Sequence, residues 1–213
     1  MMSTPLPMAV AVVGRAPELG KVKQRLANAL GDEQALQVYR ALLERTLHTC
    51  AASGLPVWFF ATSEENEEVQ TLARRYRCRL HQQPAGDLGE RMAHAFAQVH
   101  HHARQVVLVG TDCPSLNTAD LWQLCGAAGR GRAALIAAED GGYVAIASGD
   151  ARLWQQQRPF DGVAWGSETA LTDTVKWLRR YEEKVTICAT KCDLDTPADL
   201  SRSRKAGLIT SGA

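Results

Sequence analysis

Runs of apolar residues alternate along this chain with longer stretches in which apolar positions recur every three to four residues. The runs predict buried strands at 8–13, 56–61, 105–110, 133–138, 143–147 and 184–189, with a short strand near 78–81. The periodic stretches predict helices at 22–30, 32–53, 63–77, 88–101, from 117 or 118, from 167 to 181, and from 196 onward. This alternation predicts an α/β fold, a three-layer sandwich around a mostly parallel sheet.

The central apolar run begins at Val106 and stops abruptly at the turn sequence GTDCP, residues 110–114. An uninterrupted apolar run bounded by turn residues is typical of a strand buried on both faces of a parallel sheet. Such sheets bind ligands beyond the carboxyl ends of their strands, so Asp112 is a candidate catalytic or metal-binding carboxylate. The alternative is that Asp112 only caps the turn before the next helix.

Composition narrows the classes of protein that fit this pattern. The 213 residues, 46% of them hydrophobic, suit a single domain spanning 1–213. A formal net charge of +1 gives no overall field for nucleic acid or a membrane surface, and no apolar run approaches the ~20 residues that span a bilayer. The N-terminus predicts a strand and no secretory signal. Six scattered cysteines without a C-x-x-C pair favour a cytoplasmic location.

Four cations gather around the turn that follows the first predicted strand. The candidate phosphate-binding set combines them with two glycines: Gly14, Arg15, Gly20, Lys21, Lys23 and Arg25. Backbone N–H groups at a helix start, flanked by lysine and arginine, suit phosphate oxygens. The spacing matches neither a Walker loop nor the G-x-G-x-x-G dinucleotide fingerprint. The alternative is a solvated basic helix start that binds no ligand.

Acidic residues occupy the predicted loops that follow other strands. Asp112 ends the central strand, Asp140 lies in the sequence EDGGY, and Asp193 and Asp195 follow the last strand. Mg²⁺ takes one or two carboxylates together with substrate phosphates and water. Asp112, Asp193 and Asp195 are therefore candidate ligands of a Mg²⁺ or Mn²⁺ ion that bridges a diphosphate. The alternative for Asp195 is a part in capping the last helix, a role also open to Asp199.

The sequence DGGY at 140–143 combines two glycines with an aromatic ring. Gly141 and Gly142 would let the backbone approach a substrate closely, and Tyr143 would supply a ring against it. Trp165 lies beside a glycine in an irregular stretch and is a candidate for stacking on a substrate. The alternatives are a tight β-turn at 140–143 and a tryptophan that belongs to the core.

Six short motifs occur in order along nearly the whole chain, from about residue 9 to residue 200. They are PELGKVKQRLANALG at 17–31, GDLGERM at 86–92, GTDCPSL at 110–116, AEDGGYVAIA at 138–147, FDGVAWGSE at 160–168 and DLDTPADL at 193–200. Together they resemble a bacterial glycosyltransferase-A-like family within the nucleotide-diphospho-sugar transferase superfamily. The resemblance implies a Rossmann-like sandwich of the nucleotide-diphospho-sugar transferase fold.

The resemblance also implies a nucleotide bound over the N-terminal half of the chain. The loop at 14–25 would embrace the nucleotide, with Lys23 and Arg25 on its phosphates. Asp87 and Arg91 of the second motif would join this nucleotide site.

By the same resemblance, Asp112 would be the metal-binding carboxylate at the end of the central strand. Asp193 or Asp195 resembles the C-terminal aspartate that completes a metal site in related cytidylyltransferases. The DGGY segment and the loop around Trp165 would line the acceptor side. The chain departs from the usual pattern in carrying one central aspartate instead of Asp-x-Asp.

Together these features predict a divalent-metal-dependent transferase with a nucleotide or nucleotide-sugar donor. The metal and the basic loop would neutralise the charge that develops on the leaving diphosphate. If the enzyme is an inverting glycosyltransferase, Asp140 is the candidate base. The expected partners are the donor and a small-molecule acceptor, with neither nucleic acid nor membrane. The sequence leaves the base, the sugar, the acceptor and the oligomeric state open.

Three other functions compete with this prediction. One is a nucleotidyltransferase resembling the guanylyl- and cytidylyltransferases of cofactor synthesis, which would release pyrophosphate. Another is a nucleotide-binding domain with degenerate chemistry, an alternative that the single central aspartate leaves open. The third is a phosphohydrolase built on the D-x-D of residues 193–195, which we disfavour because too little chain follows to complete such a fold.

Overall fold

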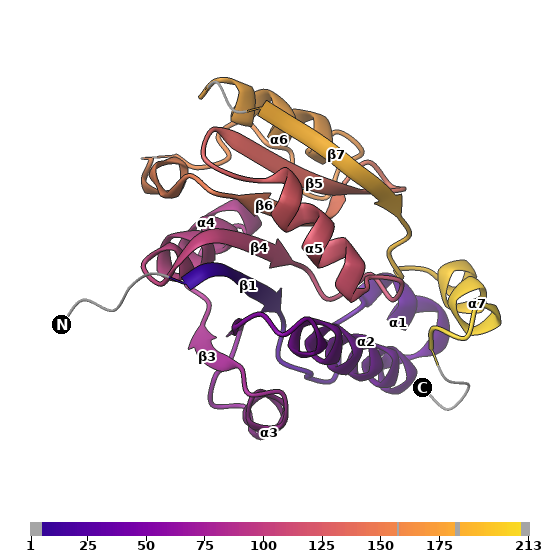
Figure 1. Cartoon of the computed structure of the whole chain (residues 1–213). Helices are drawn as coiled ribbons and strands as arrows, with labels where there is room; N and C mark the ends of the chain where they lie inside the picture. The colour runs from indigo at the N-terminus through magenta and orange to yellow at the C-terminus, as the bar shows by residue number, and fades with distance from the viewer. Residues whose placement is uncertain (1–5, 157, 182–183, 210–213) are drawn as a thin grey trace.

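The computed structural model describes residues 6–156, 158–181 and 184–209. Seven strands form one sheet in the order β3-β2-β1-β4-β6-β5-β7 (Figure 1). The strands are β1 (Leu6–Gly14), β2 (Val57–Ala61), β3 (Arg79–Gln82), β4 (Ala103–Val109), β5 (Arg132–Ala138), β6 (Tyr143–Ser148) and β7 (Lys184–Lys191). All neighbours are parallel except β6, which is antiparallel to both β4 and β5. The predicted α/β fold with a mostly parallel sheet is confirmed.

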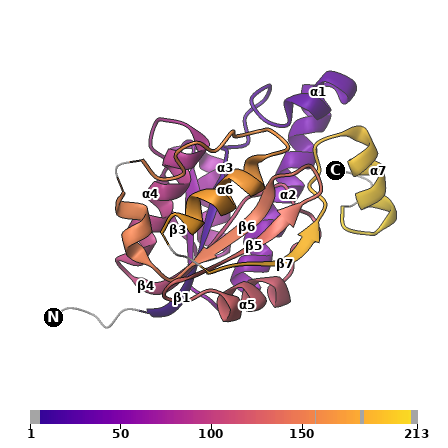
Figure 2. The ribbon, with the colours of Figure 1, turned by 90° about the horizontal axis from the view of Figure 1, so that it is seen from above.

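Helices cover both faces of the sheet and complete the three layers (Figure 2). They are α1 (Gln24–Leu30), α2 (Asp32–Ala52), α3 (Glu67–Arg75), α4 (Leu88–His100), α5 (Thr118–Ala127), α6 (Ala170–Arg179), α7 (Pro197–Lys205) and the short 3-10 helix η1 (Ala151–Gln155). The helices α2, α3 and α5 bury their apolar residues against one face, while α4, α6 and η1 cover the other. A separate small cluster joins α1, α2 and α7.

The alternating direction of side chains along a strand explains why the central strands are apolar without interruption. In β1, Val10 and Val12 belong to the core under α2 and α5, whereas Ala9 and Ala11 belong to the core under α4 and α6. In β4, every residue of 106–109 is buried. A strand with helices on both faces has no solvent side, so its sequence shows no polar alternation.

The reversed strand β6 brings a hairpin turn to the end of the sheet where the parallel strands finish. The turn at residues 139–142 joins β5 to β6, and β6 pairs back along β4 from Val109↔Ala145 to Val106↔Ser148. The start of β6 therefore lies beside the carboxyl ends of β1 and β4. In parallel sheets this is the edge at which ligands bind.

Two predicted helix starts are wrong. The helix expected from residue 63 begins at Glu67, because the side chain of Asn66 accepts the N–H groups of Glu68 and Val69. The helix expected to be capped by Ser167 begins at Ala170, after Thr169. Ser167 instead closes the preceding turn, where its hydroxyl donates to the Ala164 carbonyl at 2.8 Å.

The predicted start of the last helix is confirmed. Thr196 forms a capping box with Asp199, and Pro197 occupies the first turn. Asn117 caps α5 in the same way, together with Asp120. In the part of the chain described by the structure, none of the helices combines the length and the apolar character needed to cross a membrane.

Candidate active site

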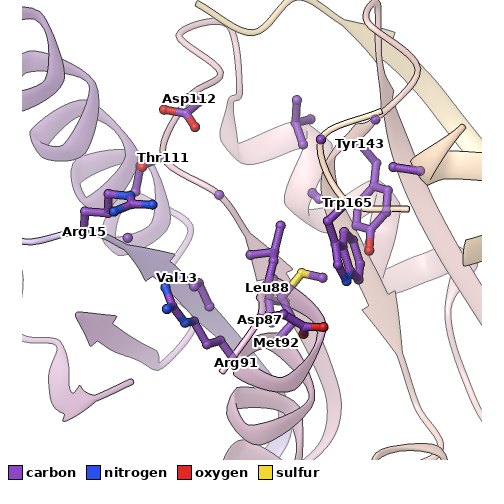
Figure 3. Close-up of a pocket in the computed structure, with 18 of the residues that line it drawn as sticks. Val13, Arg15, Asp87, Leu88, Arg91, Met92, Thr111, Asp112, Tyr143 and Trp165 are labelled. Carbon is purple, nitrogen blue, oxygen red and sulfur yellow. The ribbon is translucent and has the colours of Figure 1, made fainter. Parts of the chain in front are cut away.

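A cavity of about 550 Å³ opens at the carboxyl ends of β1 and β4 and the start of β6 (Figure 3). Its walls differ in chemical character. Figure 3 shows Arg15 and Arg91 on one side and the rings of Tyr143 and Trp165 on the other, with Asp112 at the rim. The cavity therefore combines a basic wall and an aromatic wall.

The basic wall starts with the loop after β1, which Tyr39 of α2 holds in place. The Tyr39 hydroxyl accepts the Arg15 N–H at 2.7 Å and donates to the Arg15 carbonyl at 2.8 Å. Burial raises the pKa of this hydroxyl, so it stays protonated at neutral pH. The loop ends at Lys23, which has a left-handed backbone conformation (φ 49°) and precedes α1.

Lys23 ties this loop to two other parts of the chain. Its ammonium Nζ lies 2.5 Å from Asp112 Oδ1, 2.9 Å from Asp195 Oδ1 and 2.6 Å from the Leu194 carbonyl oxygen. The Leu194 N–H also donates to the Asp112 carbonyl oxygen at 2.8 Å, which joins the loops after β4 and β7. Burial alone would lower the pKa of Lys23, but the two carboxylates outweigh it and raise the pKa, so the ammonium is charged.

These contacts bear on the helix-capping alternative for Asp112 and Asp195. Asn117, not Asp112, caps α5, and the Asp112 side chain is 50% exposed at the rim of the cavity. The Asp195 side chain is likewise outside the capping box of α7, which Thr196 and Asp199 form, although its backbone N–H donates to Asp199 Oδ2 at 3.1 Å. Both carboxylates are therefore turned toward Lys23 instead of serving a helix end.

Two further carboxylates lie near this group. Asp140 lines the cavity, and its Oδ1 accepts the Gly142 N–H at 2.8 Å, which shapes the hairpin turn. Burial, then the neighbouring charges of Asp140 and Asp195, raise the pKa of Asp193 to about 6. Among the described residues, no three acidic, histidine or cysteine side chains are grouped so as to hold a metal ion. A metal here would need oxygens from a ligand as well.

Arg91 is another cation of the basic wall. It lies on the first turn of α4, and its Nε is buried with no hydrogen-bond acceptor among the described residues. A buried donor without an acceptor is costly, so this atom is suited to an anionic ligand. Asp87 caps the same helix through a capping box with Glu90, so its carboxylate already accepts a backbone N–H.

The aromatic wall depends on two close approaches of glycine. Trp165 lies against Gly89 of α4, where an added Cβ would come within 3.0 Å of the indole. Gly141 has a positive φ of 91°, and a Cβ there would be 2.1 Å from the Glu168 carbonyl oxygen. Trp165 and Tyr143 meet edge to face with ring centroids 6.3 Å apart. Glycine is thus needed where the loop that carries Trp165 packs on its neighbours.

The structure brings most of the predicted site residues to the cavity. Those that line it are Gly14, Arg15, Lys23, Asp87, Arg91, Asp112, Asp140, Gly142, Tyr143 and Trp165. Asp195 contacts Lys23, which lines the cavity. Asp193 lies close enough to Asp140 and Asp195 for their charges to raise its pKa. The roles assigned to these residues stay predictions.

Four other predicted residues do not line the cavity. Gly20 forms a turn beside Asp32, and Gly141 packs under the Trp165 loop. Lys21 is 70% exposed and pairs with Glu18 at 2.6 Å. Arg25 is 69% exposed, with its Nη1 3.9 Å from Asp195 Oδ2. Of these three cations, Lys23 is therefore buried at the cavity, whereas Lys21 and Arg25 are exposed outside it.

The sequence analysis missed several residues that complete the walls: Val13, Tyr39, Gln83, Leu88, Met92 and Thr111. Gln83 is buried, and its amide donates to the carbonyls of Gly14 at 2.6 Å and Phe60 at 2.8 Å. It follows β3 directly, which is the same signal that singled out Asp112 after β4. The apolar members carry no such signal, because they look like ordinary core residues.

Comparison with known proteins agrees with this fold. The chain has the nucleotide-diphospho-sugar transferase fold, and its structural neighbours are nucleotidyl and glycosyl transferases. It belongs to a family of uncharacterized proteins conserved in bacteria, DUF2064, whose profile matches residues 46–167. The matched segment includes Asp112 and Trp165, while Lys23 and Asp195 lie outside it. The sequence matches none of the curated proteins with which it was compared.

Three solved structures illustrate the likeness. A provisionally named nucleotide-diphospho-sugar transferase from Desulfovibrio desulfuricans has a TM-score of 0.80 and 24% identity, over 96% of this chain and 89% of that one. The 4-diphosphocytidyl-2C-methyl-D-erythritol synthase of Anaerococcus prevotii has a TM-score of 0.61 and 11% identity, over 93% and 98%. Glucosyl-3-phosphoglycerate synthase of Mycobacterium tuberculosis, solved with Mn²⁺ and UDP, has a TM-score of 0.53 and 9% identity, over 94% and 77%. These structures share the predicted nucleotide-diphospho-sugar transferase fold, which is confirmed.

Proposed function

We propose that this protein is a transferase that binds a nucleotide or nucleotide sugar in the cavity beside β1 and β4 and uses a divalent metal. The observation that carries the proposal is the meeting of Lys23, Asp112 and Asp195. Residues from three distant segments form one cluster of a cation and two carboxylates, in which Lys23 and Asp112 line the cavity and Asp195 contacts Lys23. That arrangement suits a diphosphate, whose charge needs both cationic side chains and a metal ion.

The donor set fits a divalent ion in part. Asp112 and Asp195 each direct an oxygen at one shared cation, now the Lys23 ammonium, so the same two oxygens could reach a Mg²⁺ or Mn²⁺ ion. With two carboxylates from the protein, the remaining ligands would be phosphate oxygens and water, as is usual for Mg²⁺. When bound, the ion would neutralise charge on the leaving phosphate group.

In this proposal each wall of the cavity binds a different part of the substrates. Arg15 and Arg91 bind phosphate oxygens, and the buried Nε of Arg91 gains the acceptor that it lacks. Tyr143 and Trp165 take the sugar or acceptor against their rings. Asp140, at the hairpin turn, serves as the base that accepts the proton of the attacking hydroxyl.

A nucleotidyltransferase is the second candidate, and one observation favours it. The end of β4 carries a single aspartate, and the second carboxylate of the pair comes from the loop after β7. This is the arrangement that the resemblance to cytidylyltransferases implies. The fold of this chain also matches a diphosphocytidyl synthase with a TM-score of 0.61. Product analysis separates the two reactions, because a nucleotidyltransferase releases pyrophosphate and a glycosyltransferase releases a nucleoside phosphate.

A thermal-shift panel of nucleotides and nucleotide sugars, with and without Mn²⁺, tests the proposal. A ligand at about 100 times its Kd adds ~2.7 kcal/mol to the free energy of unfolding, which a melting curve resolves easily. We expect at least one member to raise Tm, and more so with Mn²⁺. No shift with any member would refute the proposal. A shift that Mn²⁺ leaves unchanged would favour a degenerate nucleotide-binding domain.

The setting that we propose is the reducing cytoplasm. All six cysteines carry free thiols in the structure. Burial raises the pKa of Cys78 and of Cys125 to about 11, so these thiols stay protonated and unreactive at neutral pH. Proteins with several unpaired thiols are typical of that compartment.

A further inference from the structure

The side chain of Lys23 is enclosed to an unusual degree for a lysine. Only 3% of it is exposed, and the ammonium has three oxygen neighbours, which matches its three N–H donors. Two of the neighbours are the oxygens of Asp112 and Asp195 to which the proposed function assigns the metal ion. The lysine and the metal thus compete for the same position.

We infer that Lys23 is a built-in counter-ion that keeps free divalent cations off Asp112 and Asp195, so that a metal enters only together with phosphate groups that take over the displaced ammonium. This inference rests on the proposed function for the identity of the phosphate compound. Its first part, the exclusion of free metal, concerns this chain alone and is tested without any nucleotide.

Electrostatics explains why both cations cannot share the two carboxylates. A Mg²⁺ ion binds carboxylate oxygens at about 2.1 Å, and the ammonium lies 2.5 and 2.9 Å from the same oxygens. The two positive centres would be only a few ångströms apart in a partly buried site, where the repulsion is strong. One of them must leave.

Free metal cannot readily displace the lysine because the ammonium would lose all three partners at once. A buried charge that loses its partner is strongly destabilising. The next open space is the cavity itself, which Lys23 lines together with Arg15. Besides the carboxylates just given up, the described acidic residues that line this space are Asp87 and Asp140, and each already accepts a backbone N–H. Phosphate oxygens in the cavity would supply an anion for the ammonium.

The surrounding backbone is built to stay in place during such an exchange. The Leu194 N–H donates to the Asp112 carbonyl oxygen at 2.8 Å, so the loops after β4 and β7 remain joined when the lysine side chain moves. The Lys23 carbonyl accepts the Ala27 N–H at 2.8 Å and so anchors its residue at the start of α1. Only side-chain rotation of Lys23 is required.

The first experiment measures Mn²⁺ binding by calorimetry, with no nucleotide present. Lys23→Met removes the counter-ion, and we expect it to bind Mn²⁺ at least tenfold more tightly than the unmodified protein. Lys21→Met is the matched control, because it removes the same charge from the same loop at an exposed residue that pairs with Glu18. It should leave Mn²⁺ binding unchanged within twofold.

A second pair of variants guards against a folding defect. Lys23→Gln is neutral but still donates hydrogen bonds, and it replaces Lys23→Met if that variant fails to melt cooperatively. Lys23→Arg keeps the positive charge and should show no gain. Equal Mn²⁺ affinity in the unmodified protein and in the neutral variants overturns the inference, as does a gain of equal size in Lys21→Met.

The second experiment uses inorganic pyrophosphate as the phosphate probe in melting curves of the unmodified protein. We expect Mn²⁺ and pyrophosphate together to raise Tm by more than the sum of their separate effects. A full shift with Mn²⁺ alone overturns the inference. If the neutral variants gain Mn²⁺ affinity but no nucleotide or pyrophosphate shifts Tm, the exclusion of free metal stands and the proposed function fails.

Discussion

The two walls of the cavity are built on different physical principles. The basic wall, around Lys23 and Asp112, is held by charges that come together from residues as distant along the chain as 23 and 195. The aromatic wall, around Trp165, is held by shape, because the Trp165 ring fills the space beside Gly89 and the Glu168 backbone fills the space beside Gly141. A charge-held wall responds to pH and ligands, whereas a shape-held wall responds to added volume. The difference shows which kind of change each side of the site tolerates.

The largest expected loss of stability comes from adding a methyl group to the aromatic wall. Gly141→Ala forces a positive φ on a residue with a side chain and pushes its Cβ into the Glu168 carbonyl. We expect the free energy of unfolding to fall by about 3 kcal/mol, measured by urea denaturation. Gly162→Ala is the control, because its φ is also positive at 83° but no atom lies within 4 Å of the added Cβ. It should cost about 1 kcal/mol.

An equal loss in both glycine variants would mean that backbone strain alone matters and that the contact with Glu168 does not. The difference between the two variants therefore measures the close approach itself. A difference near zero would contradict the description of the aromatic wall as shape-held.

The next effect separates ligand binding from stability on the basic wall. Arg91→Met removes the buried Nε that has no acceptor among the described residues. We expect it to weaken binding of a phosphate compound tenfold to a hundredfold, since hydrogen bonds to charged groups are worth about 1.5–3 kcal/mol. The free energy of unfolding should stay the same or rise slightly, because an unsatisfied buried donor has gone.

Calorimetric titration and urea denaturation measure these two quantities on the same samples. Arg74→Met, at an exposed position on α3 away from the cavity, is the control and should change neither. Unchanged affinity in Arg91→Met would remove this residue from the proposed phosphate site.

The smallest effect is a pH dependence. The pKa of Asp193 is raised to about 6 in the folded protein, so the folded state binds more protons than the unfolded state between about pH 4 and 6. Stability therefore falls as pH rises through that range. Asp193→Asn should be more stable than the unmodified protein at pH 7, by about 1 kcal/mol after allowance for solvent screening at a half-exposed group.

This advantage should disappear below pH 4, where Asp193 is protonated in both states. Urea denaturation of both proteins between about pH 3 and pH 7.5 gives the comparison directly. A constant difference across the range would show that Asp193 carries no raised pKa.

The fold was largely predictable because each strand carries its own signal. The apolar run at 106–109 predicts a strand with two buried faces, and the structure has one. Thr196 followed by Pro197 predicts a helix start, and α7 begins there. Such features depend on neighbours in sequence. Ser63 and Ser167 misled the prediction because other polar residues stand nearby at the true helix starts. Asn66 caps α3 with its side chain, whereas Thr169 precedes α6 without a side-chain cap hydrogen bond.

The site was predictable only in part. Residues that follow strands directly, such as Asp112, could be placed at one edge of the sheet from the pattern alone. The pairing of Lys23 with Asp195 depends on how the loops after β1 and β7 pack, which no local pattern specifies. The same holds for Trp165, whose place against Gly89 follows from a tertiary contact between an irregular loop and α4.

The reversed direction of β6 builds one side of the cavity from a hairpin that is separate in sequence from the basic wall. Because β6 runs against β4 and β5, the turn at 139–142 brings Asp140, and the start of β6 brings Tyr143, to the opening. Gly141 within this turn cannot take a side chain, because Glu168 lies against it. In the proposed function, the turn contacts the acceptor and lies apart in sequence from Lys23 and Asp195, so a substitution of Asp140 would change acceptor binding more than phosphate binding.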